Sequence, residues 1–436
     1  MSPKKRIIID TDPGCDDTLA MLLALSANPE ELEVVMLSVT YGNVPLDACL
    51  KNTVAIFQVL DKELQWRREN GIEEGFPALK TYKPIIAAGP SHPLEDEELV
   101  ADYFHGLDGL HNVHATHPHL APEGDVAKIF DDHASGAADH SNYSKYFTPA
   151  KLPAHKEILR LLKENPADSI TILAVGPLTN VALAASEDPE TFLRVKEVVV
   201  MGGAVAVEGN VTPVAEFNTF ADVIATARVF ALTSRTPNFT LPPKTDKTTL
   251  PPYPDKLSRQ LNLTLCPLDI TTPHEIGRTY FNSAIKERLA AGSPLAVWTS
   301  HFLSGAFSTI ERFWHGDGEP GLSLHDPLTV WYMLCRDDPK WKLMPQPEDI
   351  RIETEGQWAR GQHIADRRGK RKPAVDAVAA SQDPLNDPEI IALDTVKGDE
   401  MGWLSVLKGN RVNRIIESPG EELFREVMMQ RIFNLS

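Results

Sequence analysis

The chain has 436 residues, of which 42% are hydrophobic, and it carries a formal net charge of −18. This length and composition predict a globular protein with one large α/β domain or a few domains of average size. The negative charge argues against nucleic acid or a membrane surface as partner, because phosphate groups are bound by positive surfaces. We therefore expect a small neutral or cationic ligand, or a metal ion.

The four cysteines show no paired spacing, so the sequence indicates neither a disulfide framework nor a zinc site. A few unpaired cysteines are typical of proteins in a reducing compartment. The first residues lead directly into an apolar strand without the apolar core of a signal peptide, and no window approaches the length of a membrane span. We expect a cytoplasmic protein, with the nucleus not excluded.

Apolar, β-branched runs alternate with helix-like segments, which is typical of a parallel sheet covered on both faces. The expected strands are 6–10, 33–40, 84–88, 170–175, 197–201 and 261–267. The expected helices are 17–27, 46–60, 178–185, 223–231, 293–313 and 327–335, and a last strand and helix lie within 406–433. The sequence therefore predicts an α/β fold with an open, doubly wound, mostly parallel sheet and helices on both faces.

Three segments interrupt this alternation. Residues 63–80 are polar and charged, residues 111–150 are rich in His, Asp, Ala and Pro, and residues 367–400 open with a basic run. The alternation resumes after the first two, so we expect surface insertions or flexible loops within a single domain that spans 1–436. The His-rich segment lacks ligand-like spacing, which favours a solvated or lid-like loop over a second metal site.

Polar residues follow the expected strands at the points where the strands end. Asp12 comes after the first strand, Asn43 after the second, and Val175 closes the fourth. Ligands of open parallel sheets bind outside the carboxyl ends of the strands. We therefore expect these positions to meet in one crevice.

The stretch "IIIDTDPGCDD" at 7–17 places four aspartates within eight positions directly behind an apolar strand. One aspartate is enough to cap the helix that begins there. Four crowded carboxylates repel one another unless a cation lies between them. Carboxylate oxygens are preferred by Ca²⁺ or Mg²⁺ rather than by zinc, so the stretch predicts a site for a hard cation.

The same stretch carries a resemblance to a known family. "DTDPGCDD" at 10–17 resembles the N-terminal motif of the inosine-uridine nucleoside hydrolase family, and further motifs occur in the family's order over 5–110 and 155–366. These are "TYGN" at 40–43, "HGLDGL" at 105–110, "AVGPLTNVALA" at 174–184, "VVVMGGA" at 198–204, "GNVTPVAEFNTFAD" at 209–222 and "LHDPLTV" at 324–330. The resemblance implies Ca²⁺-dependent hydrolysis of the N-glycosidic bond of ribonucleosides.

The resemblance also implies roles for individual residues. Ca²⁺ would be bound by Asp12, Asp17, Asp326 and the backbone carbonyl of Val175. Asp12 would be the base that activates a calcium-bound water, because calcium acidifies water only weakly. His325 would give a proton to the leaving base, as in the part of the family that accepts both inosine and uridine.

A second group of residues would contact the substrate. Hydrolysis of the C1'–N bond passes through an oxocarbenium-like state, which hydrogen-bonding amides and carboxylates stabilise. The substrate-binding residues implied by the resemblance are Asp16, Asn43, His105, Asn210, Glu216, Phe217 and Asn218. The family further implies a homodimer or homotetramer and a role in purine and pyrimidine salvage.

The sequence allows two alternative functions, one as an enzyme of another type and one as a binding protein. "DTDPG" superficially resembles the motif of Mg²⁺-dependent phosphatases, with Asp10 as nucleophile, but Gly14 stands where those enzymes have Thr or Val. The other is a catalytically inactive protein that binds Ca²⁺ and ribose. The preferred base stays open, with inosine, uridine and nicotinamide riboside among the candidates, since the 201–210 loop is one residue longer than the family pattern.

Overall fold

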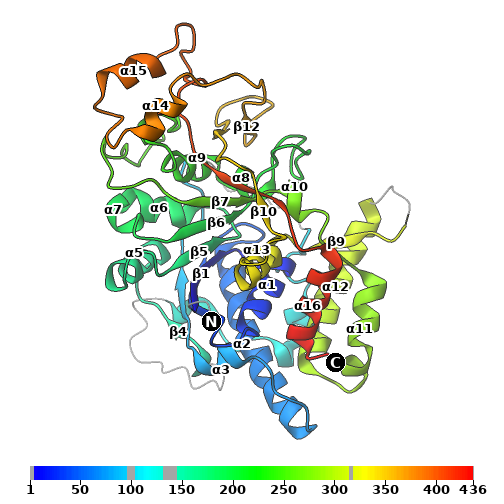
Figure 1. The fold of residues 1–436 in the computed structure, drawn as a ribbon. Coiled ribbons are helices and arrows are strands. Elements are labelled where there is room, and N and C mark those ends of the chain that lie inside the picture. Colours follow the sequence, from blue (N-terminus) through cyan, green and yellow to red (C-terminus); the bar gives the residue numbers. More distant parts are fainter. Residues whose placement is uncertain (1–3, 96–103, 131–144, 314–317, 436) are drawn as a thin grey trace.

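The computed structural model describes residues 4–95, 104–130, 145–313 and 318–435. Within these residues a nine-stranded sheet forms the centre of the molecule, in the order β10-β13-β7-β6-β5-β1-β2-β3-β4 (Figure 1). Every neighbouring pair is parallel except the antiparallel pair of β10 and β13. The chain adds β2, β3 and β4 on one side of β1 and β5, β6 and β7 on the other, so the strand order reverses beside β1.

The strands of the main sheet are β1 (Lys5–Thr11), β2 (Leu32–Val39), β3 (Ile85–Ala88), β4 (Thr148–Pro149), β5 (Thr171–Ala174), β6 (Glu197–Met201), β7 (Leu263–Cys266), β10 (Lys342–Leu343) and β13 (Asn413–Glu417). Two small antiparallel pairs join β8 (Glu275–Gly277) to β9 (Gly321–Ser323) and β11 (Ile350–Ile352) to β12 (His363–Ala365).

The helices are α1 (Cys15–Leu25), α2 (Leu46–Glu69), α3 (Pro77–Thr81), α4 (Val113–Thr116), α5 (Ala154–Glu164), α6 (Thr179–Glu187), α7 (Pro189–Phe192), α8 (Phe217–Ala221), α9 (Val223–Ala231), α10 (Leu268–Thr271), α11 (Arg278–Ala290), α12 (Pro294–Phe313), α13 (His325–Cys335), α14 (Val375–Ala380), α15 (Pro388–Asp394) and α16 (Glu421–Phe433). Short 3-10 helices lie at Pro118–Leu120, Val126–Ile129 and Pro237–Phe239.

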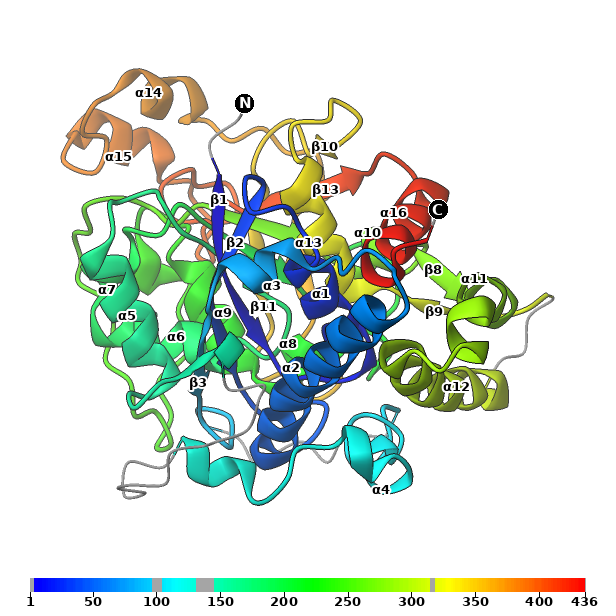
Figure 2. The same cartoon turned by 90° about the horizontal axis from the view of Figure 1, so that it is seen from below.

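Helices cover both faces of the sheet, as Figures 1 and 2 show. Successive side chains of a strand point to opposite faces, and β1 is apolar on both. Ile7 and Ile9 belong to the core cluster that includes residues of α1, α2, α12, α13 and α16, whereas Ile8 belongs to the cluster that includes residues of α5, α6 and α9. Each fully buried side chain of this kind contributes about 1.5–3 kcal/mol. This arrangement confirms the predicted doubly wound α/β fold.

The prediction of a surface insertion at 63–80 is wrong where the segment enters the core, although twelve of its eighteen residues lie at least partly at the surface. Helix α2 continues to Glu69, and Phe76 and Leu79 lie in the core. Glu63 and Arg67 look like surface residues in the sequence, but both are buried and form an ion pair of 2.7 Å. Their remaining polar atoms are also bonded, since Ser293 donates to Glu63 and Arg67 donates to the Ile432 carbonyl. Satisfied hydrogen bonds allow such charged groups to be buried.

The 111–150 segment is described only outside residues 131–144. The described part is more than a solvated loop, because it forms α4 and two 3-10 helices and sends Val113, Leu120 and Phe147 into the core.

The 367–400 segment contains α14 and α15, which Figure 1 shows at one end of the molecule. These helices contribute to a small separate cluster of buried residues formed by Ala374, Val378, Ile390 and Leu407. The segment is therefore not a plain loop. Among the described helices, none combines the length and apolar character that spanning a membrane requires.

Candidate active site

A cavity of about 340 Å³ lies where β1, β2, β5 and β6 end. Twelve site residues are expected from the sequence, and all of them line this cavity except Asp12 and Asp17, which are fully buried. The other lining residues are Phe104, Met201, Val211, Ile310, Gly321, Leu322 and Ser323. Met201 lies within the motif at 198–204 and Phe104 directly precedes the motif at 105–110, so both could have been found, whereas no sequence signal singles out Ile310 or Leu322.

The turn between β1 and α1 is held together by Asp17. Its Oδ2 accepts a hydrogen bond from the Gly14 backbone N–H at 3.0 Å, and its Oδ1 accepts from the Thr11 hydroxyl at 2.6 Å. The side chain of Asn43 also donates to Oδ2, at 3.0 Å. Asp17 thus braces the start of α1, the structural role that any aspartate before a helix can have. This role accounts for one aspartate of the motif.

Asp12 has a different environment. Its Oδ2 accepts a hydrogen bond of 2.7 Å from the Asn43 backbone N–H, but its buried Oδ1 has no hydrogen-bond partner among the described residues. A Cβ at Gly42 would lie only 2.0 Å from Oδ2, so this close approach requires glycine. Burial raises the pKa of Asp12 well above its ordinary value, and the charges of Asp17 and Asp16 add to the effect. One carboxylate oxygen is therefore left to accept a proton or a cation.

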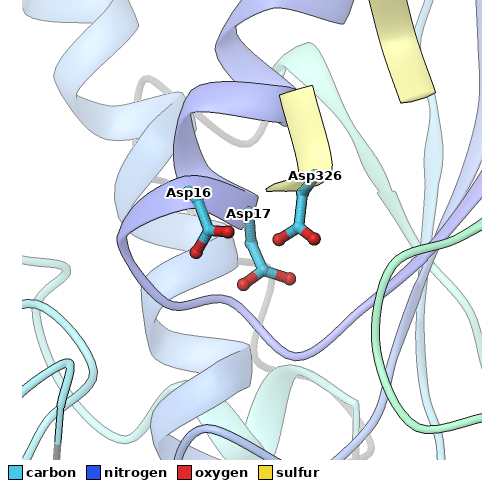
Figure 3. A group of neighbouring side chains, drawn as sticks. All are labelled: Asp16, Asp17 and Asp326. Atoms are coloured by element: carbon cyan, nitrogen blue, oxygen red, sulfur yellow. The ribbon is translucent and has the colours of Figure 1, made fainter. Parts of the chain in front are cut away.

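Three further carboxylates lie beside one another. Each of Asp16, Asp17 and Asp326 has an oxygen within 4.8 Å of an oxygen of the other two. Figure 3 shows that the first two come from the start of α1 and the third from the start of α13. Burial and mutual repulsion raise the pKa of Asp16 to about 7 and that of Asp326 well above its ordinary value. Because all the ligand atoms are oxygens, the group fits a hard divalent cation.

The carbonyl of Val175 faces the same cavity from the end of β5. It accepts a hydrogen bond of 2.8 Å from the side-chain amide of Asn218, which lies in α8. Glu216 caps α8, where its Oε1 accepts from the Asn218 N–H and its Oε2 accepts from the Gly203 and Thr219 N–H groups. These bonds hold the amide of Asn218 and the carboxylate of Glu216 at the cavity wall in fixed orientations.

Two histidines face the cavity as neutral side chains. His105 Nδ1 accepts a hydrogen bond of 3.1 Å from the Cys15 backbone N–H, so the ring proton is on Nε2. His325 Nδ1 lies 2.7 Å from the Thr271 hydroxyl. Burial lowers the pKa of His105 to about 3 and that of His325 to about 4. The two rings therefore bring neutral hydrogen-bonding nitrogens to the cavity.

The structure does not support the phosphatase alternative. Asp10, the nucleophile in that interpretation, is fully buried and does not line the cavity. Its Oδ1 accepts hydrogen bonds from Ser38 and Asn180, which brace β1 against its neighbours. Asp10 is bonded to these neighbours and is not one of the grouped carboxylates at the start of α1 and α13, so it has a structural place in the sheet.

Comparison with known proteins identifies the family of the chain. The family profile described as "Inosine-uridine preferring nucleoside hydrolase" matches residues 7–387. The chain belongs to this family. It is therefore an N-ribosyl hydrolase that acts on ribonucleosides.

Two curated relatives are 25% and 28% identical. The non-specific ribonucleoside hydrolase RihC of Klebsiella pneumoniae is 25% identical over 374 residues, which cover 86% of this chain and 92% of the relative. The pyrimidine-specific ribonucleoside hydrolase RihA of Shewanella woodyi is 28% identical over 366 residues, which cover 83% and 88%. These two relatives differ in the bases that they accept, so membership of the family alone does not define the base.

The fold of the nucleoside hydrolase family is also found by structural comparison. The plant nucleoside hydrolase PpNRh1 superposes with a TM-score of 0.62, covers 99% of both chains and is 21% identical. The similarity extends over the central sheet and the helices on both of its faces, which agrees with the predicted fold.

Proposed function

We propose that this nucleoside hydrolase cleaves the N-glycosidic bond of inosine-type and uridine-type ribonucleosides in a calcium-dependent reaction, with Asp12 as the base that takes a proton from the attacking water. The observation that carries the proposal is the unpartnered Oδ1 of Asp12, which is buried close to the three carboxylates of Asp16, Asp17 and Asp326. A buried carboxylate with a raised pKa and a free oxygen is suited to accept a proton.

Asp12, Asp17, Asp326 and the Val175 carbonyl would hold the calcium ion. When bound, calcium supplies positive charge that offsets the buried carboxylates and orders the ribose hydroxyls and the attacking water. The free Oδ1 of Asp12 supports this assignment, and so do the neighbouring oxygens of Asp17 and Asp326, which lie together with an oxygen of Asp16. The Val175 carbonyl accepts one hydrogen bond from Asn218 and keeps a second lone pair.

The polar wall of the cavity would bind the ribose. Asn43, Asn218 and Asn210 can hydrogen-bond hydroxyl groups, and the Asn210 amide is oriented because its Oδ1 accepts from the Phe217 N–H at 2.9 Å. The carboxylates of Asp16 and Glu216 place negative charge where the oxocarbenium-like sugar becomes positive. Preorganised charge of this kind stabilises the transition state without reorganisation.

The apolar and aromatic part of the cavity lining would bind the base. It comprises the rings of His105 and Phe104 and the side chains of Ile310 and Leu322. His325 lies beside the calcium ligand Asp326. We propose that its ring takes up a proton from solvent and that the imidazolium passes this proton from Nε2 to the departing base, which returns the ring to the neutral form that burial favours. The Thr271 hydroxyl at Nδ1 fixes the orientation of this ring.

Replacing Thr271 by valine tests that orientation. Valine keeps the shape of the buried side chain but removes the hydrogen bond to His325, so we expect kcat to fall about 10-fold through misplacement of the ring. The measurement is kcat and KM for the best nucleoside. Thr299→Val is the matched control, because the buried Thr299 hydroxyl bonds only within α12. Equal losses in the two variants would contradict a role for Thr271 in orienting His325.

Ribose release from a panel of nucleosides tests the proposed function directly. The panel contains inosine, uridine, other ribonucleosides and nicotinamide riboside, each assayed with and without chelator. We expect release that stops with chelator and returns with added calcium. A folded protein that binds calcium and releases no ribose from any nucleoside would overturn the proposed reaction.

Membership of the family also supports proposals about the metabolic role, the cellular location and the oligomeric state of the protein. We propose that it serves purine or pyrimidine salvage, that it works in the cytoplasm, and that it assembles as a homodimer or homotetramer. Sedimentation of the purified protein measures the last of these, and a monomer at micromolar concentration would contradict it.

A further inference from the structure

Asn52 is a fully buried amide in the second turn of α2. Its Nδ2 donates two hydrogen bonds of 2.8 Å, one to the Pro13 carbonyl and one to the Asp108 carbonyl. Its Oδ1 lies 2.7 Å from Nε2 of His114, which is itself buried. Asn52 does not line the cavity, yet it bonds to two segments that do.

The chemistry of the partners defines the orientation of this amide. Two carbonyl oxygens can only accept, so the Asn52 nitrogen must face both of them. Its oxygen then faces His114, whose Nε2 must carry the ring proton and donate it. Both donors of the amide are used, and the two carbonyls prevent the amide from rotating by half a turn, since its oxygen would then face two acceptors.

The two carbonyls belong to the two sides of the site. Pro13 lies in the turn that carries Asp12 and Asp17, whereas Asp108 lies in the loop that brings His105 into the cavity. Two further links between these segments both start at Cys15, whose N–H donates to His105 Nδ1 and whose thiol donates to the Gly109 carbonyl at 3.9 Å. Among the described residues, Asn52 is therefore one of three polar ties between the aspartate turn and the histidine loop, and it contributes two of their hydrogen bonds.

The approach of the two segments is close enough to require a glycine. Gly109, next to Asp108, has φ +83°, and a Cβ there would lie 2.6 Å from Asn52 Nδ2 and 3.1 Å from the Pro13 carbonyl oxygen. The backbone of the histidine loop thus lies directly against the amide and the aspartate turn. A side chain shorter than asparagine at position 52 would leave both carbonyls without their buried donor.

We propose that Asn52 is a positioning residue that couples the aspartate turn to the loop of His105, so that one buried amide sets both the calcium ligands and the imidazole that faces the substrate. The inference rests on the proposed function, since it assigns calcium to the turn and substrate to the histidine. It predicts that loss of Asn52 changes two separable properties, calcium affinity and nucleoside turnover.

Asn52→Ala tests the proposal with two measurements on the purified full-length protein. Calcium affinity is measured by titration calorimetry on chelator-stripped protein, and kcat and KM are measured at saturating calcium. Loss of a residue that orients the ligands around a site typically costs roughly 10-fold to 100-fold in affinity or activity. We expect losses in that range for both quantities. If Asn52→Ala does not fold, His114→Ala, which only frees the amide oxygen, should show the same two losses at roughly 3-fold to 10-fold.

A matched control separates positioning from stability. Thr53→Val removes a hydroxyl that is buried in the same helix turn and bonds only to the Cys49 carbonyl. It should lower Tm at most slightly and leave calcium affinity and kcat/KM within about 2-fold of the wild type. Equal calcium affinity in Asn52→Ala, His114→Ala and wild type would overturn the proposal.

A double-mutant cycle tests whether Asn52 acts through His105. In the His105→Ala background, Asn52→Ala should cost less in kcat/KM than in the wild type, because part of its effect has already been removed. Strict additivity of the two losses would overturn this coupling. Failure of the proposed function can be distinguished from failure of the role proposed for Asn52. If the wild type binds calcium but releases no ribose, the proposed function is wrong, and the calcium affinity of the variants still tests the tie between Asn52 and the turn.

A wild type that binds no calcium would overturn both the proposed function and the role of Asn52.

Discussion

Asp12→Asn is expected to lower kcat for nucleoside hydrolysis by about 10³-fold at saturating calcium, within the range that a positioned general base contributes. The Asn43 N–H donates to Oδ2, so the oxygen of the introduced amide will take that position. Its NH₂ group then replaces the unpartnered Oδ1, and a donor stands where the base must accept a proton. The measurement is kcat from initial rates of ribose release.

Glu197→Gln is the matched control for the loss of a buried carboxylate. Glu197 lies in β6, is 2% exposed and is bonded to Thr264 and Arg336, outside the cavity. Its amide variant should keep kcat within about 3-fold of the wild type. An Asp12→Asn enzyme with wild-type kcat would show that another group takes the proton and would refute the assignment of the base.

Removal of calcium is expected to lower Tm, and the loss should grow as pH rises. Free calcium at 1,000 times Kd stabilises the folded state by about 4 kcal/mol, which corresponds to a Tm increase of roughly 5 °C for a chain of this size. The comparison is a pair of thermal unfolding curves, with calcium and with chelator. Equal Tm values in the two conditions at neutral pH would argue against a metal at the aspartate cluster.

The sign of the pH dependence follows from the raised pKa values of the cluster. The pKa of Asp16 is raised from 3.8 to about 7 by burial and by the charge of Asp17. In the metal-free protein the folded state keeps a proton on this carboxyl group that the unfolded chain has released. The contribution of this group to the free energy of unfolding is therefore fully present below about pH 4 and is lost as pH rises to about 7. Calcium offsets the charge, so its effect on Tm should be small near pH 5 and large near pH 8.

Asp326→Asn provides the control for this second experiment. It removes one carboxylate from the cluster and should reduce the calcium-dependent rise in Tm at every pH. A calcium effect that is larger near pH 5 than near pH 8 would contradict the linkage, because protonated carboxyl groups bind calcium poorly.

Much of the fold could be predicted because its signals are local. Six strands of the parallel sheet are buried runs of β-branched and apolar residues, and each is bounded by turn residues that end it. The helices between these strands are predicted from the helical spacing of their apolar residues. The prediction for 63–80 fails at Glu63 and Arg67, because polar residues in a sequence are expected at the surface. Glu63 and Arg67 are buried only because Ser293 and the Ile432 carbonyl, hundreds of residues away along the chain, complete their hydrogen bonds.

For the site, too, local features could be predicted from the sequence and contacts between distant segments could not. The sequence by itself determined the aspartate turn, since Pro13, Gly14 and the capping Asp17 are neighbours whose conformation depends on local chemistry. Only the tertiary structure decided that Asp326 joins this turn and that Ile310 and Leu322 complete the cavity wall, because α12, β9 and α13 reach the site by packing on the sheet. It also decided that Asn52 bonds to both the turn and the histidine loop. Periodicity shows which face of a helix is buried, but the partner of a buried polar group depends on how distant segments pack.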